Sequence, residues 1–212
     1  MKFDLYEYIG VIVPGAVILL ACSILYPSLL PMLTSSITLG DLGLVLIFAF
    51  VAGHLVQAGG NLWELIIWYF AGGVPTSWAI NGSKALLSKE QIIRLEEKLM
   101  NDFKLGSSDV ILESGIIREI YVRVRKLGKS DRVEKFNRNY GLMRGVAVAL
   151  IASGLLAVIN DFDYWPEALL LFFLASVATY RMVRFGKHYA RELYAEYLAI
   201  DNSIKPKNPL KT

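Results

Sequence analysis

The sequence predicts an all-α integral membrane protein with four transmembrane helices, arranged as two hairpins with a small cytoplasmic helical layer between the second and third helices. Hydrophobic residues make up 55% of the 212 residues and charged residues only 19%, whereas an ordinary soluble domain carries about 25% charged residues. Long uncharged runs alternate with charged segments, and the Lys and Arg residues gather in some of these segments only. This composition excludes a disordered chain and a water-soluble domain.

The first predicted hairpin covers residues 1–70. No charged residue occurs from Tyr8 to Gly40, so we place the first span at about 9–30, where Pro27 and Pro31 end it. The second span covers about 42–63, and its helix runs on to about residue 70. The sequence Ala-Gly-Gly-Val-Pro at 71–75 then stops it.

Residues 71–135 form a predicted cytoplasmic helical segment. Ser88 and Gln91 have the spacing of a capping box, which predicts a helix from Lys89 to about Lys104. Apolar residues at helical spacing predict a second helix over about 116–127. A third helix begins after Ser130 and continues into the membrane.

The second predicted hairpin covers residues 136–183, with spans at about 142–160 and 165–182. The acidic turn at 160–167 joins them. Beyond this hairpin, residues 184–212 are predicted to be a cytoplasmic extension of the last helix, followed by a disordered tail from Asn202.

The distribution of Lys and Arg predicts the orientation. One basic residue lies in the N-terminal tail, fourteen lie between residues 72 and 144, and seven follow from Arg181 onward. None lies at 26–41 or at 145–180, the segments that contain the two short loops predicted on the other side of the membrane. Because positive residues stay in the cytoplasm, both termini and the central segment are expected there, in a multi-pass protein.

Four polar residues of the second span share one helical stripe, because they are spaced by 3, 4 and 3 residues: His54, Gln57, Asn61 and Glu64. Such a stripe must face protein or water. One interpretation is a pore lining or proton pathway. The other is a hydrogen-bonded seam between helices, in which Glu64 pairs with Arg138, Arg144 or Arg181.

A second stripe, with the same spacing, is basic: Arg181, Arg184, His188 and Arg191. The guanidinium groups suit phosphate, so this stripe is a candidate anion-binding site for anionic lipid, a nucleotide or RNA. The alternative is ordinary positive charge flanking a span. The spacing of Arg181 and His188 also fits a ribonuclease motif loosely, but Met182 departs from it.

Small residues recur every four positions along the third span: Gly141, Gly145, Ala149 and Ser153. Such a ridge allows close helix packing, within one chain or between subunits. The chain has no P-loop, no nucleophile elbow and no zinc-protease motif, so we do not expect an enzyme. One cysteine and two histidines also argue against a metal site, and no cofactor is expected.

Several segments together resemble a group of four-span bacterial membrane proteins found in antiviral defence loci. These segments are 8–15, 53–57 with Glu64, 136–144, and 184–185 with Tyr189, Glu192 and Tyr194. The resemblance implies a homo-oligomeric protein of the bacterial inner membrane that forms a pore or depolarises the membrane, under the control of its cytoplasmic helices. The alternative is a non-conducting anchor or sensor subunit that recruits a cytosolic protein through residues 89–127. The expected partners are therefore the lipid bilayer, further copies of the chain, a cytosolic protein, and anionic lipid or a nucleotide.

Overall fold

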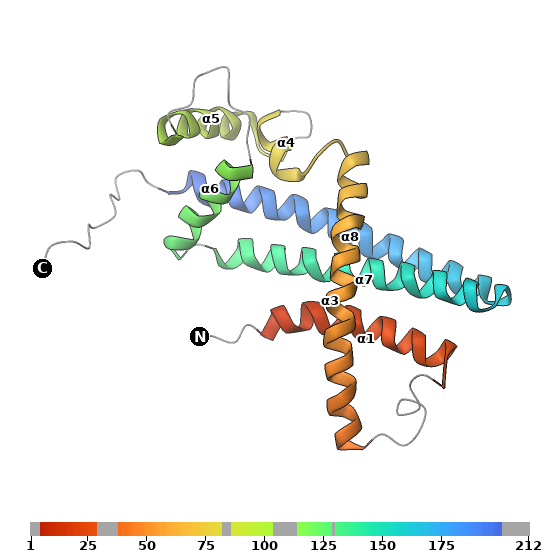
Figure 1. Ribbon diagram of the computed structural model, residues 1–212. Coiled ribbons are helices and arrows are strands. Elements are labelled where there is room, and N and C mark those ends of the chain that lie inside the picture. The colour runs from red at the N-terminus through yellow and green to blue at the C-terminus, as the bar shows by residue number, and fades with distance from the viewer. Residues whose placement is uncertain (1–4, 29–37, 82–85, 104–113, 129, 201–212) are drawn as a thin grey trace, which may run out of the picture. The chain divides into compact units, whose positions relative to one another are not determined.

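The computed structural model describes residues 5–28, 38–81, 86–103, 114–128 and 130–200. Over these residues the protein is helical and contains no strand (Figure 1). The elements are α1 (Leu5–Leu25), α3 (Leu39–Phe70), α4 (Pro75–Asn81), α5 (Lys89–Phe103), α6 (Ser114–Lys126), α7 (Asp131–Asn160), the 3-10 helix η1 (Phe162–Tyr164) and α8 (Trp165–Leu198). Four helices, α1, α3, α7 and α8, are long and apolar enough to cross a membrane. The helical fold and four helices with the length and composition of membrane spans are as predicted from the sequence.

The helix of the first span is shorter than predicted. α1 ends at Leu25, whereas the sequence interpretation extended the span to about residue 30, beyond the last described residue at this point. The difference has a simple cause, because a residue that precedes proline avoids the helical conformation, and Tyr26 precedes Pro27.

Both ends of α3 are built from local signals. Thr38 is the N-cap, and its hydroxyl accepts a hydrogen bond from the backbone of Asp41, whose carboxylate in turn accepts one from the Thr38 backbone. At the other end Gly72 and Gly73 adopt φ angles of 75° and 102°, which glycine tolerates better than other residues. The predicted continuation to about residue 70 is confirmed.

The chain divides into two compact units. The first comprises residues 1–73 and 135–186. In this unit α1 and α3 touch where they cross (Figure 1), and glycines allow the close approach. A Cβ atom on Gly15 would overlap the backbone of Ala49, and one on Gly53 would overlap the backbone of Val11. The contact therefore requires glycine at both positions.

Contacts at both ends relate α7 and α8 in the first unit. The rings of Phe136 and Phe185 lie 6.4 Å apart. Towards the other end, a Cβ on Gly154 would lie 2.8 Å from the Phe172 ring. Early residues of α7 therefore meet late residues of α8, so the two helices run in opposite directions.

The second unit comprises residues 74–134 and 187–212. Its core is apolar and fully buried, with Leu95, Leu99, Ile120, Val124 and Leu193 at 0% exposure. α5 begins with the predicted capping box, in which the backbone N–H of Gln91 donates to Ser88 Oγ at 3.2 Å and the Ser88 N–H donates to Gln91 Oε1 at 2.9 Å. The pKa of the neighbouring Glu90 carboxyl is lowered, because it accepts hydrogen bonds from the Glu90 backbone N–H and from the Ser88 side chain.

Asp102 joins three helices of the second unit. Its Oδ2 accepts hydrogen bonds from Arg123 Nη1 at 2.9 Å and from the Tyr197 hydroxyl at 2.6 Å. These residues belong to α5, α6 and the last turns of α8. The segment predicted between the two hairpins is thus one compact body with the end of α8. The predicted disordered tail lies outside the described residues.

Candidate functional site

The predicted polar stripe of α3 is divided between two environments. Gln57 and Glu64 are half-buried, whereas His54 and Asn61 are exposed. The two half-buried residues contact α1 and α7. The stripe is therefore one feature in sequence but two in the structure.

Gln57 satisfies a backbone group that a proline leaves free. Pro14 lies inside α1 and has no N–H, so it cannot donate to the carbonyl of Gly10 four residues earlier. Gln57 Nε2 donates to this Gly10 carbonyl at 2.9 Å and to the Gly141 carbonyl at 3.3 Å. Since lipid offers no hydrogen bonds, this side chain meets a requirement that Pro14 creates.

An ion pair continues the same set of contacts. Arg144 Nη1 on α7 forms a salt bridge with Glu64 Oε2, and Arg144 Nη2 donates to Gln57 Oε1 at 3.1 Å. We call Gln57, Glu64 and Arg144 the polar cluster. Glu64 thus pairs with one of the three partners considered from the sequence, while Arg181 lies over the Phe185 ring, 5.3 Å from its centroid, and Arg138 is half-buried on α7.

Gly60 makes room for this ion pair. A Cβ on Gly60 would lie 3.2 Å from Arg144 Nε and 3.3 Å from its Cγ, so the arginine side chain crosses α3 at this glycine. Arg144 Nε is buried and makes no hydrogen bond to any residue that the structure describes. The remaining hydrogen bonds of the cluster therefore hold the guanidinium in place.

Two tryptophans extend the polar contacts along α3. Trp68 Nε1 donates to the Tyr140 hydroxyl at 2.8 Å, and Trp63 Nε1 donates to Thr179 Oγ1 at 3.2 Å. Trp68 is 5% exposed, so its indole N–H needs this partner. Neither contact is predicted from the sequence.

The arrangement of the polar cluster supports a structural role. Glu64 and Arg144 neutralise each other, and both ends of the Gln57 amide are hydrogen-bonded. Among the described residues there is no group of His, Cys, Asp and Glu that could hold a metal ion. The cluster joins α1, α3 and α7, as a hydrogen-bonded seam would.

The exposed half of the stripe has different surroundings. The His54 ring lies edge-on to Phe50, with centroids 4.6 Å apart. The Asn61 carboxamide makes no hydrogen bond within the described part of the chain. Within the apolar stretch of α3 these two side chains are polar and exposed, whereas Gln57 and Glu64 are half-buried.

The small-residue ridge of α7 packs against other helices of the first unit. Ala149 is fully buried and Ser153 is 2% exposed, and the Ser153 hydroxyl donates to the Ala149 carbonyl at 2.8 Å. A Cβ on Gly145 would lie 2.7 Å from Pro14 Cγ, and Gly141 supplies a carbonyl to Gln57. The ridge is occupied by helices of its own chain.

The four residues of the basic stripe lie along α8, two in each unit. Arg181, Arg184 and Arg191 are exposed and His188 is half-buried. Arg191 Nε donates to the Leu86 carbonyl at 3.0 Å within the second unit. Binding of anionic lipid or a nucleotide by these residues stays a prediction.

The roles of Pro14 and Gly15 at this site were also not predicted from the sequence. A proline in a span followed by glycine signals a free carbonyl and a close helix approach, but it does not say which polar side chain will meet that carbonyl.

Comparison of the chain with protein-family models, with curated proteins and with solved structures finds no match in any of the three.

Proposed function

We propose that this chain is a homo-oligomeric protein of the bacterial inner membrane that makes the membrane permeable. The observation that carries the proposal is the exposure of His54 and Asn61 on a helix apolar enough to span a membrane. Polar side chains within a span are costly in lipid and need protein or water around them. An oligomer that encloses a water-filled path provides both.

The proposal includes a topology. The helices α1, α3, α7 and α8 cross the bilayer, α7 and α8 as a hairpin, and the second unit forms a cytoplasmic layer. The support is the distribution of charge, because the basic residues gather at 72–144 and from Arg181 onward and are absent from 26–41 and 145–180. Both termini are cytoplasmic in this arrangement.

Control through the cytoplasmic helices is part of the same proposal, and the resemblance to proteins of antiviral defence loci suggests an effector role. A signal that moves the second unit would act on the membrane through the two continuous helices, since both α7 and α8 extend from the first unit into the second. The polar cluster then holds the spans together while they move.

Reconstitution tests the proposal. Purified protein in proteoliposomes is expected to form oligomers and to release a small trapped dye or K⁺, whereas protein-free liposomes prepared in parallel retain it. A monomeric preparation that leaves the liposomes sealed would refute permeabilisation by an oligomer.

A non-conducting anchor or sensor is the second candidate. The observation that favours it is the exposure of Ile93 on α5 (56%) and Val122 on α6 (38%), which gives the second unit apolar surface for a cytosolic partner. Native purification separates the two candidates, because an anchor co-purifies with a stoichiometric cytosolic protein and a self-sufficient pore does not need one.

A further inference from the structure

One set of exposed residues on α3 follows a heptad pattern. Six exposed residues are spaced by 4, 3, 4, 3 and 4 positions, which is the spacing of residues that meet a second helix in a coiled coil. We call them the α3 seam: Ile47, Val51, His54, Ala58, Asn61 and Leu65. The apolar members are well exposed, with Ile47 at 60%, Val51 at 53% and Leu65 at 68%.

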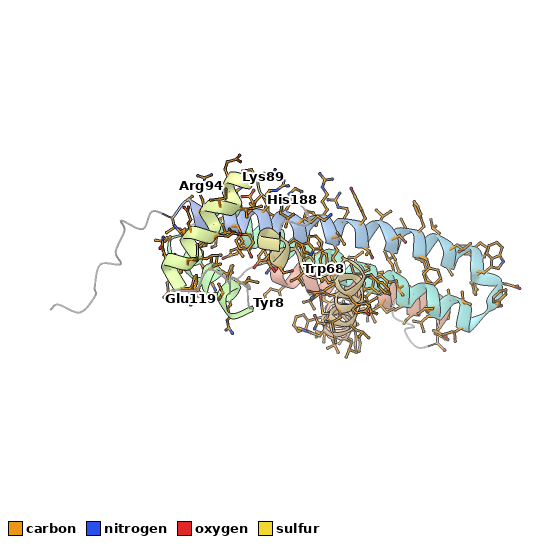
Figure 2. All side chains as sticks on the ribbon, turned by 90° about the horizontal axis from the view of Figure 1, so that it is seen from above. Tyr8, Trp68, Lys89, Arg94, Glu119 and His188 are labelled. Atoms are coloured by element: carbon orange, nitrogen blue, oxygen red, sulfur yellow. The ribbon has the colours of Figure 1, made fainter. Side chains whose placement is uncertain are left out.

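The opposite face of α3 is covered by its own chain. Gly53 lies against Val11 of α1, and Gly60 lies against Arg144 of α7. Val56, between them, is 8% exposed. Figure 2 looks along α3 and shows side chains projecting from the helix all round its axis. The seam is therefore part of the wide surface of α3 that its own chain leaves open, which also includes Leu55 at 73% and Leu62 at 62% exposure.

The polar members of the seam differ from other polar residues in the spans. The hydroxyls of Ser153 and Ser176 donate to carbonyls of their own helices, at 2.8 and 2.9 Å, and Thr179 accepts from Trp63. The Asn61 carboxamide has no such bond in the described chain. A carboxamide carries both donors and an acceptor, so an identical side chain can satisfy it.

We infer that the α3 seam binds the α3 seam of further copies of this chain, with Asn61 hydrogen-bonded to Asn61 of its neighbours. This rests on the oligomer in the proposed function and names the surface that forms it. All copies enter the membrane in one orientation, so a cyclic oligomer brings their α3 helices together in parallel, with equal residues at equal depth. Ala58 lies between the two polar positions and lets the helices approach closely.

Another apolar surface of the first unit lacks this complementarity. Leu169, Leu170 and Phe173 of α8 are exposed to 56%, 59% and 65%. These residues are wholly apolar, so lipid chains cover them without leaving a polar group unsatisfied. The position of Asn61 and His54 thus selects α3, and a protein partner with the same polar pattern, rather than lipid.

Disulfide scanning tests the seam directly. Cys22 is the single cysteine, so Cys22→Ser gives a cysteine-free background. Ala58→Cys and Leu65→Cys are expected to give disulfide-linked dimers when membranes are oxidised. Val56→Cys on the covered face, and Phe173→Cys on the exposed face of α8, serve as controls and are expected to stay monomeric. Equal cross-linking at the seam and at Phe173→Cys would overturn the inference.

Substitution of Asn61 provides the second readout. Asn61→Leu is expected to reduce the cross-linked fraction of Ala58→Cys at least several-fold, while Asn61→Gln retains most of it. An unchanged fraction in Asn61→Leu would remove the carboxamide from the interface.

The outcomes separate this inference from the proposed permeability. Seam cross-links in a protein that leaves liposomes sealed would support the seam and refute the pore. Leakage from liposomes without seam cross-links would support the pore and place the interface elsewhere, which overturns the inference.

Discussion

At the scale of single residues, the polar cluster shows how a proline in one helix creates the need for a polar side chain on another helix. Pro14 removes a backbone hydrogen bond from α1, and Gln57 of α3 supplies a donor to the Gly10 carbonyl that is left over. The sequence revealed both residues as unusual in an apolar span. It could not connect them, because the connection depends on where α1 and α3 cross.

The contact between Gln57 and the Gly10 carbonyl predicts that a second substitution, at Pro14, restores part of the stability lost at Gln57. Gln57→Leu leaves the Gly10 carbonyl without its donor and is expected to destabilise the protein by about 1–3 kcal/mol. Adding Pro14→Ala restores an N–H in α1, so the double variant is expected to lose less stability than Gln57→Leu alone. Denaturant unfolding of the four proteins in mixed micelles measures this difference. If Pro14→Ala gives no relief, the proline does not create the need for Gln57.

The ion pair between Arg144 and Glu64 predicts that losing one partner costs more stability than losing both. Arg144→Leu leaves the half-buried Glu64 unpaired, and breaking a buried pair on one side costs about 3–5 kcal/mol. Replacing both partners, with Glu64→Leu and Arg144→Leu together, is expected to cost less than Arg144→Leu alone. The exposed Arg184→Leu is the control, with little effect. A double variant that loses the sum of the two single losses would show that the residues do not interact.

At the scale of elements, local signals predicted most helices. The capping box at Ser88, the glycines after Phe70 and the periodic apolar residues of α5 and α6 act over a few residues, so sequence alone reveals them. What the sequence did not reveal is that the last turns of α8 belong to the second unit. That association depends on Tyr197 reaching Asp102, 95 positions apart in the chain.

Asp102 is therefore expected to stabilise the packing of α5, α6 and α8. Asp102→Ala removes the acceptor of both Tyr197 and Arg123, which we expect to cost about 1.5–3 kcal/mol. Glu119→Ala is a matched control, because Glu119 also pairs with Arg123 but is 53% exposed, so its loss is expected to cost at most about 0.5 kcal/mol. Hydrogen exchange of the amides of α5 and α6 in the intact protein measures the stability loss in each of the two variants. Equal protection in the two variants would contradict the role of Asp102.

At the scale of the whole molecule, charge and hydropathy predicted the class of protein. Uncharged runs located four apolar helices, because the cost of charge in lipid acts on any sequence in the same way. The crossing of α1 and α3 could not be predicted in this way. It depends on two glycines, Gly15 and Gly53, and many glycines in spans make no such contact.

The proposed topology predicts the labelling of single cysteines in the Cys22→Ser background. Asp163→Cys, in the connection between α7 and α8, is expected to react with a membrane-impermeant maleimide in intact spheroplasts. Arg125→Cys in α6 is expected to react only after permeabilisation, although the Arg125 side chain is 69% exposed. Labelling of Arg125→Cys in intact spheroplasts would show that the orientation is opposite to the proposed one.

Conductance across a planar bilayer tests the central claim, that oligomers of this chain carry ions along a path lined by α3, most directly. The wild-type protein is expected to conduct, and Asn61→Asp is expected to shift the reversal potential in a salt gradient towards the cation value, because a carboxylate in the path attracts cations. The matched variant Leu169→Asp, on the exposed face of α8, is expected to leave the reversal potential unchanged. Absence of wild-type conductance, or a reversal potential that does not respond to charge at residue 61, would contradict the account.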